Sequence, residues 1–176
     1  MLKLASLRAL IEQCVPDLKR DPERLKIVGE DGRIVATGTP ALSFEYQYGA
    51  DILILDYTGH TDALFVPIIA WMKVNQSEQM DNPQLREKAI EFRVEHLNDH
   101  AADIGIWLQL TERVIVKRDP AAGAPNRLTL THPEEPCHVG TVCQAEHWEL
   151  WLRNEKKLAE WDLAPPPARD WFKPAL

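Results

Sequence analysis

The stretch SFEYQYGADILILDY, residues 43–57, decides the fold of this chain. One set of alternate positions carries apolar side chains, namely Phe44, Tyr46, Tyr48, Ile52 and Ile54. The intervening set is polar first and apolar later, at Glu45, Gln47, Asp51, Leu53 and Leu55. Successive side chains of a strand point to opposite faces, so this alternation predicts one long strand, half-exposed at its start and buried towards its end. Gly49 is expected to mark a bulge or a bend in it.

A helix is predicted on each side of this strand. Near the N-terminus, apolar residues recur at spacings of three and four, at Leu4, Leu7, Leu10, Ile11 and Cys14, and the helix should end near Pro16. After the strand, Thr61 or Asp62 can cap a second helix that runs to about Asn75. That helix is apolar nearly all round and should lie in the core. Pro67 predicts either a kink or a later start that places it in the first turn.

The other strands are marked by β-prone runs around turn residues. Residues 25–37 centre on Asp31-Gly32, which predicts a hairpin. Residues 90–97 and 103–110 alternate on either side of Asn98-Asp99 and predict a second hairpin, with further strand at 114–116. Residues 118–126 form a Pro- and Gly-containing turn before a short last strand at 127–131. The polar segments 19–25 and 76–89 are expected to be turns or short helices.

The composition changes after residue 131. HPEEP (132–136) breaks the sheet, and Thr141 with Gln144 resembles a capping box for a charged helix from about 142 to 161. Residues 164–176 are Pro-rich and read as an extended tail. The predicted order is α-β-β-β-α-β-β-β-α, which indicates an α+β fold, an antiparallel or mixed sheet flanked by helices. Residues 1–136 would form one domain, and 137–176 a C-terminal helix with a Pro/Trp-rich tail.

Composition excludes several classes of protein. The 176 residues carry a net charge of −7, which disfavours binding to nucleic acid. The longest nearly apolar run, residues 63–72, is about half of a membrane span and contains Pro67. The first residues lack the pattern of a signal peptide. Three cysteines are too few for a disulfide framework, so we expect a reducing cytosol and no membrane.

Signatures of catalysis are absent from the sequence. No serine lies in a Gly-x-Ser-x-Gly elbow, and there is no Walker or Gly-x-Gly-x-x-Gly sequence. Four aspartates lie in or near predicted strands: Asp51, Asp56, Asp62 and Asp103. Such residues are more often turn or cap residues than members of a paired-carboxylate site for acid–base or metal chemistry. We therefore expect no enzyme and no cofactor.

A zinc module is the first alternative. His132, Cys137, Cys143 and His147 could supply two imidazoles and two thiolates. Five residues separate the cysteines, however, where structural sites place about two to four. A second alternative is a cytosolic adaptor that docks a partner through its C-terminal helix and Pro-rich tail.

Tryptophans gather near the C-terminus. Four of the six lie in the last 29 residues, at Trp148, Trp151, Trp161 and Trp171. In the predicted helix, Trp148, Trp151 and Leu152 share a stripe that either packs on the chain's own sheet or meets a partner. Trp171 is the better interface candidate, because a tail has little core of its own.

Several blocks of sequence, in the same order, carry a family resemblance: ALSFEYQY (41–48), LILDYTG (53–59), Asp62 with LFVPIIAWMKVNQ (64–76), DIGIWLQLTERVIVKRD (103–119) and LTLTHPEEP (128–136). In these blocks the chain resembles the phage tail completion protein R (GpR) family of temperate contractile-tailed bacteriophages. The resemblance covers most of residues 1–136, and residues 137–176 show little of it.

The resemblance implies a structural protein that is added at the head-proximal end of a phage tail. There it would stop growth of the tail tube and prepare the surface that meets the head. The element order also resembles that of tail terminators, which form closed rings, commonly hexameric. The implied partners are copies of the chain itself, tail tube and sheath proteins and head–tail connector proteins, with no sequence-specific nucleic acid. The implied location is the host cytoplasm during assembly and then the virion tail.

A closed ring needs two different, complementary faces on each subunit. Sheet edges and hairpins suit such contacts, so the segments 25–37, 118–126 and the polar start of 43–57 are candidates. The candidate interface residues are Trp148, Trp151, Trp161, Trp171, Glu45, Gln47, Glu112 and Arg113.

Overall fold

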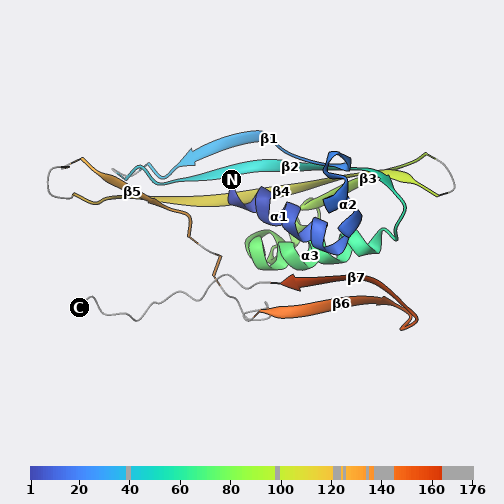
Figure 1. Ribbon diagram of the computed structural model, residues 1–176. Coiled ribbons are helices and arrows are strands. Elements are labelled where there is room, and N and C mark those ends of the chain that lie inside the picture. Colours follow the sequence, from blue (N-terminus) through green and yellow to red (C-terminus); the bar gives the residue numbers. More distant parts are fainter. Residues whose placement is uncertain are drawn as a thin grey trace.

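A long antiparallel sheet carries helices on one face, and a β-hairpin lies on the far side of those helices (Figure 1). The computed structural model describes residues 1–38, 41–97, 100–120, 124, 126–133, 135–136 and 145–163. The layers therefore run sheet, helices, hairpin. The predicted α+β class, an antiparallel sheet flanked by helices, is confirmed.

The sheet contains β1 (Leu25–Ala36), β2 (Phe44–Tyr57), β3 (Ile90–His96), β4 (Ala102–Arg118) and β5 (Leu128–Thr131). Its order is β1-β2-β4-β3, and β5 pairs with the distal end of β4. Between β3 and β5 the edge of β4 is covered by the buried Gln76. The Gln76 side chain donates to the Thr111 carbonyl (3.0 Å) and accepts from the Thr111 amide (3.0 Å). This amide side chain takes the place of a neighbouring strand.

Strand β2 confirms the alternation read from the sequence. Its residues Tyr48, Ala50, Ile52 and Ile54 are at most 1% exposed. They lie opposite Leu110, Leu108, Ile106 and Ile104 of β4, which are equally buried. Because directly opposed residues share a face, these two strands form the floor of the core.

Gly49 plays a different part from the one predicted. The pairing of β2 with β4 is regular at Gly49, and the irregularity lies in β1, between Glu30 and Arg33. A Cβ at position 49 would stand 2.5 Å from the Trp107 indole nitrogen. Glycine is required there because the Trp107 ring crosses the strand.

The predicted 25–37 hairpin is wrong, because these residues form the single strand β1. Asp31 has a φ of 50°, as a turn residue would, but the chain continues along β2 on both sides of it. The 14 residues of β2 offer a partner for the whole of β1, and this pairing outweighs the local turn signal.

The helices agree with the sequence in their main features. Helix α1 (Leu2–Cys14) buries Leu7, Leu10, Ile11 and Cys14. Helix α3 (Asp62–Asn75) begins at Asp62 with Pro67 inside it, so the predicted later start is wrong. The polar connectors form short helices: α2 (Pro16–Arg20), the 3-10 helix η1 (Pro22–Arg24), α4 (Ser77–Asp81) and α5 (Pro83–Arg86). Among the described residues, no helix is long and apolar enough to cross a membrane.

The predicted helix over 142–161 is also wrong, because β6 (Glu146–Leu152) and β7 (Lys156–Leu163) form a hairpin there. Arg153 and Asn154 have φ angles of 49° and 60°, and the Glu155 amide donates to the Leu152 carbonyl (3.0 Å). Two successive positive φ angles within this three-residue connection give a turn that matches strand twist. The proposed capping box, Thr141 and Gln144, lies outside the described residues.

The hairpin belongs to the core through β7. Ala159, Trp161 and Leu163 alternate towards α1 and α3, and each is at most 5% exposed.

We predict that Trp161→Ala lowers the free energy of unfolding by about 3–5 kcal/mol, because it leaves a cavity between the layers. Urea unfolding measures this loss. The control Trp151→Ala, at a side chain 47% exposed, should cost about 1 kcal/mol or less, and equal losses would contradict the packing of β7.

Candidate assembly surfaces

A buried carboxylate fixes the first helix to the sheet. Glu112 of β4 is only 4% exposed, and it accepts hydrogen bonds from the backbone amides of Leu2 (2.9 Å) and Lys3 (3.2 Å). The Tyr48 hydroxyl also donates to Glu112. Burial and this hydrogen bond raise the pKa of Tyr48. A carboxylate here satisfies free amides of the first turn and complements the positive end of the helix dipole.

A second carboxylate links three segments around the same place. Glu135 is in an ion pair with Lys3 (2.8 Å) and lies 3.5 Å from the Arg113 guanidinium. It thereby ties the chain after β5 to the start of α1 and to β4. Glu112, a predicted interface residue, thus positions α1 within the subunit, and Arg113 lies at the edge of this cluster with its side chain 48% exposed.

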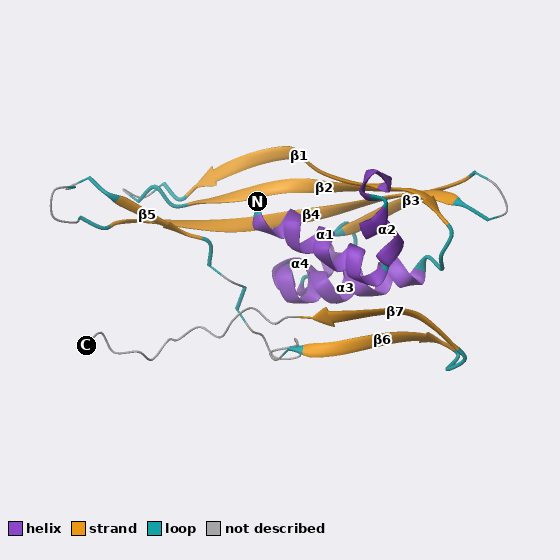
Figure 2. Cartoon of the chain, in the orientation of Figure 1, coloured by secondary structure: helices purple, strands orange, loops and turns teal. Residues whose placement is uncertain are grey.

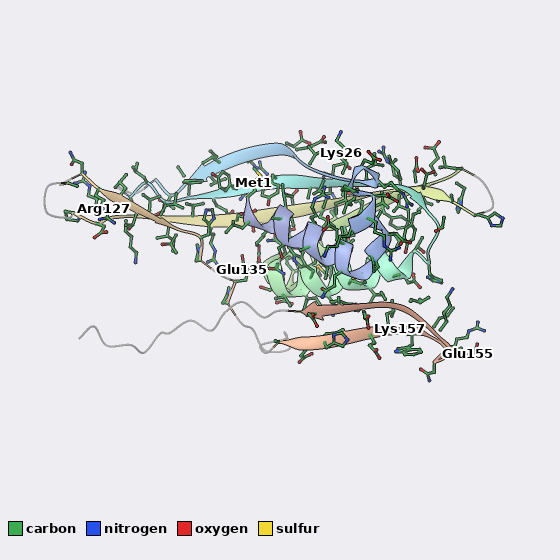
Figure 3. The ribbon with its side chains drawn as sticks, in the orientation of Figure 1. Met1, Lys26, Arg127, Glu135, Glu155 and Lys157 are labelled. Atoms are coloured by element: carbon green, nitrogen blue, oxygen red, sulfur yellow. The ribbon has the colours of Figure 1, made fainter. Side chains whose placement is uncertain are left out.

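Beyond this cluster the sheet extends past the helices as an arm, which we define as residues 33–36, 43–46, 113–119 and 126–131. Figure 2 shows the strands continuing where no helix covers them. In Figure 3, Met1 marks the end of the helical layer and Arg127 the far end of the arm. In the part of the chain that the structure describes, most of the arm is therefore a sheet without a covering helix.

One face of the arm continues the apolar face of the core. Ile34 lies opposite Tyr46, and Leu130 opposite Val116, on the face that the helices cover further along. Ile34, Leu128 and Leu130 are 65%, 48% and 59% exposed. Phe44 and Tyr46 are in edge-to-face contact between them, with centroids 4.9 Å apart. We call Ile34, Phe44, Tyr46, Leu128 and Leu130 the arm patch.

The opposite face of the sheet at this end is mostly polar, with Val35 and Ile115 as its exposed apolar residues. It carries the predicted interface residues Glu45 and Gln47, whose side chains are hydrogen-bonded at 2.7 Å, with Arg113 opposite Glu45 in register. The strand pairing thus brings Glu45, Gln47 and Arg113 together on one face. The remaining predicted interface residues lie elsewhere in the chain.

The tryptophans of the hairpin lie on different faces. Trp148 stacks on Trp161, with ring centroids 6.2 Å apart, on the face towards the helices. The indole of Trp151 donates to Glu149 (3.1 Å) on the outer face. Because side chains alternate along β6, residues three apart point to opposite faces, and the stripe expected for a helix is therefore wrong. Trp161 is 1% exposed, whereas Trp148 and Trp151 are 39% and 47% exposed; Trp171 lies outside the described residues.

The outer face of the hairpin carries a network of charges. His147 is paired with Asp162 (2.8 Å), and the Lys157 ammonium lies between Glu149 (3.3 Å) and Glu160 (2.7 Å). Asp162 is also joined to Gln13 of α1, because the Gln13 amide donates to its carboxylate (2.9 Å). This bond links the end of β7 to the helical layer. Lys157 lies near the tip of the hairpin in Figure 3.

The zinc hypothesis finds one of its residues in this network. His147 can bring a ring nitrogen within 4.8 Å of the carboxylates of Glu149 and Glu160, which is close enough for a shared cation. Lys157 already supplies a positive charge to both glutamates. His132 follows β5, and Cys137 and Cys143 lie outside the described residues. Ion pairs within the hairpin therefore account for the clustering of these charged side chains.

Neither the Glu112 contact nor the arm patch was identified from the sequence. The sequence does contain a clue to Glu112, because this charged residue occupies a position on the apolar face of β4, between Leu110 and Val114. A charged residue at a core position must find partners. Its partners, the backbone amides of α1, are 109 and 110 residues away in the chain, and no local pattern names them.

We predict that Glu112→Ala lowers the free energy of unfolding by about 2–3 kcal/mol, because the amides of Leu2 and Lys3 and the Tyr48 hydroxyl lose their acceptor. Urea unfolding measures the loss, and the two amides should exchange hydrogen faster. Glu45→Ala, on the neighbouring strand, is the control and should change stability by about 0.5 kcal/mol or less. An unchanged exchange rate would contradict the role of Glu112.

The hydrogen bond with Asp162 raises the pKa of His147 above the ordinary value of a histidine, about 6.5. Because the pKa is raised on folding, the stabilisation is complete below the unfolded pKa and is lost as the pH rises through the folded pKa. We predict that Asp162→Asn returns the pKa of His147 towards 6.5, as measured by NMR of the imidazole. Glu149→Gln should have the smaller effect, and a reversed order would disprove the pairing.

Three comparisons with known proteins bear on these surfaces. Residues 1–136 match the family model described as P2 phage tail completion protein R (GpR). The chain is 33% identical over 162 residues to the tail completion protein R of Escherichia phage P2, an alignment that covers 92% of this chain and 99% of that protein. No solved structure matches. The alignment therefore includes the arm and extends beyond the segment that the family model matches.

Proposed function

Because this chain belongs to the phage tail completion protein R (GpR) family and takes part in phage tail assembly, we propose that it completes the tail at its head-proximal end and prepares the joining of the head. The observation that carries the proposal is the match of residues 1–136 to the family, with a relative aligned over 99% of its length. The family is structural, and a virion tail location follows from it.

The geometry supports a role in binding other proteins. Polar groups that cluster in the described residues serve the fold: Glu112 holds α1, and His147 and Lys157 are in ion pairs. The surfaces left open are extended, namely both faces of the arm and the outer face of the hairpin. Such surfaces suit contacts between subunits, and we propose that the chain acts without catalysis.

We propose that copies of the chain form a closed ring on the end of the tail, six by analogy with tail terminators. Tail tube and sheath proteins would meet it on one side and head–tail connector proteins on the other. The proposed contacts are Glu45 and Arg113 on the arm, the adjoining Gln47, and the exposed Trp148 and Trp151 on the hairpin. A net charge of −7 would keep DNA from adhering to the lumen.

We propose further that residues 1–136 carry the main assembly contacts, since the family match ends at 136, although β7 shares their core. Residues 137–176 would add contacts of their own, through the exposed side of the hairpin. Assembly would take place in the host cytoplasm, before the protein becomes part of the virion tail.

The test is to delete the gene from the phage genome that encodes it and to image the particles. We expect overlong tails, or tails without heads, and recovery of normal particles when the wild-type gene is supplied. Supplying Arg113→Glu should recover fewer joined particles, because it places like charges opposite each other at Glu45. Normally sized, head-joined particles from the deletion strain would overturn the proposal.

A further inference from the structure

A pocket of about 310 Å³ lies at the edge of the sheet, beside the part of β4 that pairs with neither β3 nor β5. We call it the edge pocket. Strands β2 and β4, helix α4 and the chain after β5 each contribute side chains to it, and Figure 3 labels one of these, Glu135. Its described lining contains one cation, Arg113, and four carboxylates, namely Glu45, Glu78, Asp81 and Glu135.

Ion pairs within the chain neutralise only one of these four carboxylates. Glu135 lies 2.8 Å from the Lys3 ammonium and 3.5 Å from the Arg113 guanidinium. No described cation is in an ion pair with the other three, which are Glu45, Glu78 and Asp81. The edge pocket therefore carries an excess of negative charge, which attracts a cation from outside the chain.

The hydrogen bonds of these carboxylates leave acceptors free. Glu45 accepts from the Gln47 amide (2.7 Å), and Glu78 accepts from the Thr111 hydroxyl (2.7 Å). An ionised carboxylate has about four lone-pair sites, so one such bond does not saturate it. Each of these side chains can therefore accept from a further donor that enters the edge pocket.

A nearly buried hydroxyl also faces the edge pocket without a partner. Ser77 lines the pocket and is only 3% exposed. Its hydroxyl has no hydrogen-bond partner among the described residues, yet it is not one of the side-chain atoms shut off from solvent. The hydroxyl therefore faces the space of the pocket. Because polar groups that are almost buried normally have a partner, this one is available to a group that enters.

The spacing of the carboxylates decides which kind of cation fits. A metal ion needs several ligand atoms gathered at bonding distance around it. In the described lining, no three of the carboxylates bring their oxygen atoms within 4.8 Å of one another. Acceptors at separated points suit the guanidinium of arginine, whose five N–H donors form a rigid planar fork. We propose that the edge pocket binds an arginine side chain of a partner protein.

The partner is a protein other than a second copy of this chain. Copies that each carry a net charge of −7 repel one another, whereas a basic partner is attracted to the edge pocket. Arginine is also enriched at protein interfaces relative to the rest of the surface. The inference deepens the proposed function and rests on it for the expectation that the partner belongs to the tail.

The first test is a titration of the purified chain with Nα-acetyl-arginine amide, followed by NMR of the backbone amides. We expect saturable shifts at Ser77, Glu78 and Thr111, with a dissociation constant of about 1 mM for a ligand of this size. The citrulline analogue has the same shape without the charge, and it should bind at least about tenfold more weakly, because charge-assisted hydrogen bonds are the stronger ones.

Variants show whether the edge pocket is the place of binding. Glu78→Gln with Asp81→Asn removes two charges and keeps an acceptor for Thr111, and it should weaken arginine binding about fivefold. Ser77→Ala should weaken it as well, because one acceptor is lost. The matched control is Glu95→Gln, which removes an exposed carboxylate of β3 outside the pocket and should leave the affinity unchanged. Thermal unfolding checks that each variant is folded.

The second test supplies these variants to the strain from which the gene is deleted. We expect the Glu78→Gln/Asp81→Asn variant to recover fewer joined particles than wild type, and Glu95→Gln to recover as many. Sedimentation velocity of the purified wild type should show no association that the double variant abolishes, because the arginine comes from a different protein.

Several results would overturn the inference. The first is equal binding of the arginine and citrulline compounds, and the second is equal affinity in wild type and in the folded double variant. Full recovery of particles by that variant would show that no partner occupies the edge pocket. Self-association that depends on Glu78 and Asp81 would assign the arginine to a second copy.

Failure of this inference can be told apart from failure of the proposed function. If the titration succeeds but deletion of the gene leaves tails normal, the arginine site stands and the proposed function fails. If deletion gives unfinished tails but the chain does not bind the arginine compound, only the edge pocket has been assigned wrongly.

Discussion

The carboxylate of Glu112 beneath the first turn of α1 is the constraint on which the arrangement of this molecule depends. A buried charge at a core position of β4 has to be satisfied, and the amides of Leu2 and Lys3 with the Tyr48 hydroxyl satisfy it. This fixes where α1 begins on the sheet, and hence where the covered part of the sheet ends. Everything beyond that point, on a β4 strand of 17 residues, is left as an arm.

The position of α1 in turn fixes the layer below it. Trp71 of α3 donates to Ser6 of α1 (3.0 Å), and the two helices together receive Trp161 and Leu163 of β7. Gln13 then holds Asp162 from the same helix. The hairpin thus packs on two helices whose position the sheet determines. Its exposed side, which includes Trp151, faces away from the sheet. One molecule therefore has exposed surfaces on three of its parts, namely the sheet, α3 and the hairpin.

The sequence predicts those elements whose partners lie nearby or whose pattern is long. The alternation of β2, the spacing of α1 and the β3–β4 hairpin were all correct. The failures share a cause, which is long-range pairing that outweighs a local signal. Asp31-Gly32 reads as a turn, but β2 holds both sides of it in one strand. Trp148 and Trp151 have helical spacing, yet they lie in a strand whose pairing with β7 places residues three apart on opposite faces. Of the predicted interface residues, strand pairing brings Glu45, Gln47 and Arg113 together, and their role in an interface stays a prediction.

An uncovered apolar arm has a physical consequence for when subunits associate. A small apolar patch gives a weak contact between free molecules, because association must offset lost translational and rotational freedom. If copies of the chain bind side by side on the tail, as proposed, neighbouring copies would meet at an effective concentration of about a millimolar or more. The same weak contact would then become favourable, and each further copy would add to it. A chain whose contact is weak in solution would remain dispersed until the tail is present, and would close only upon it.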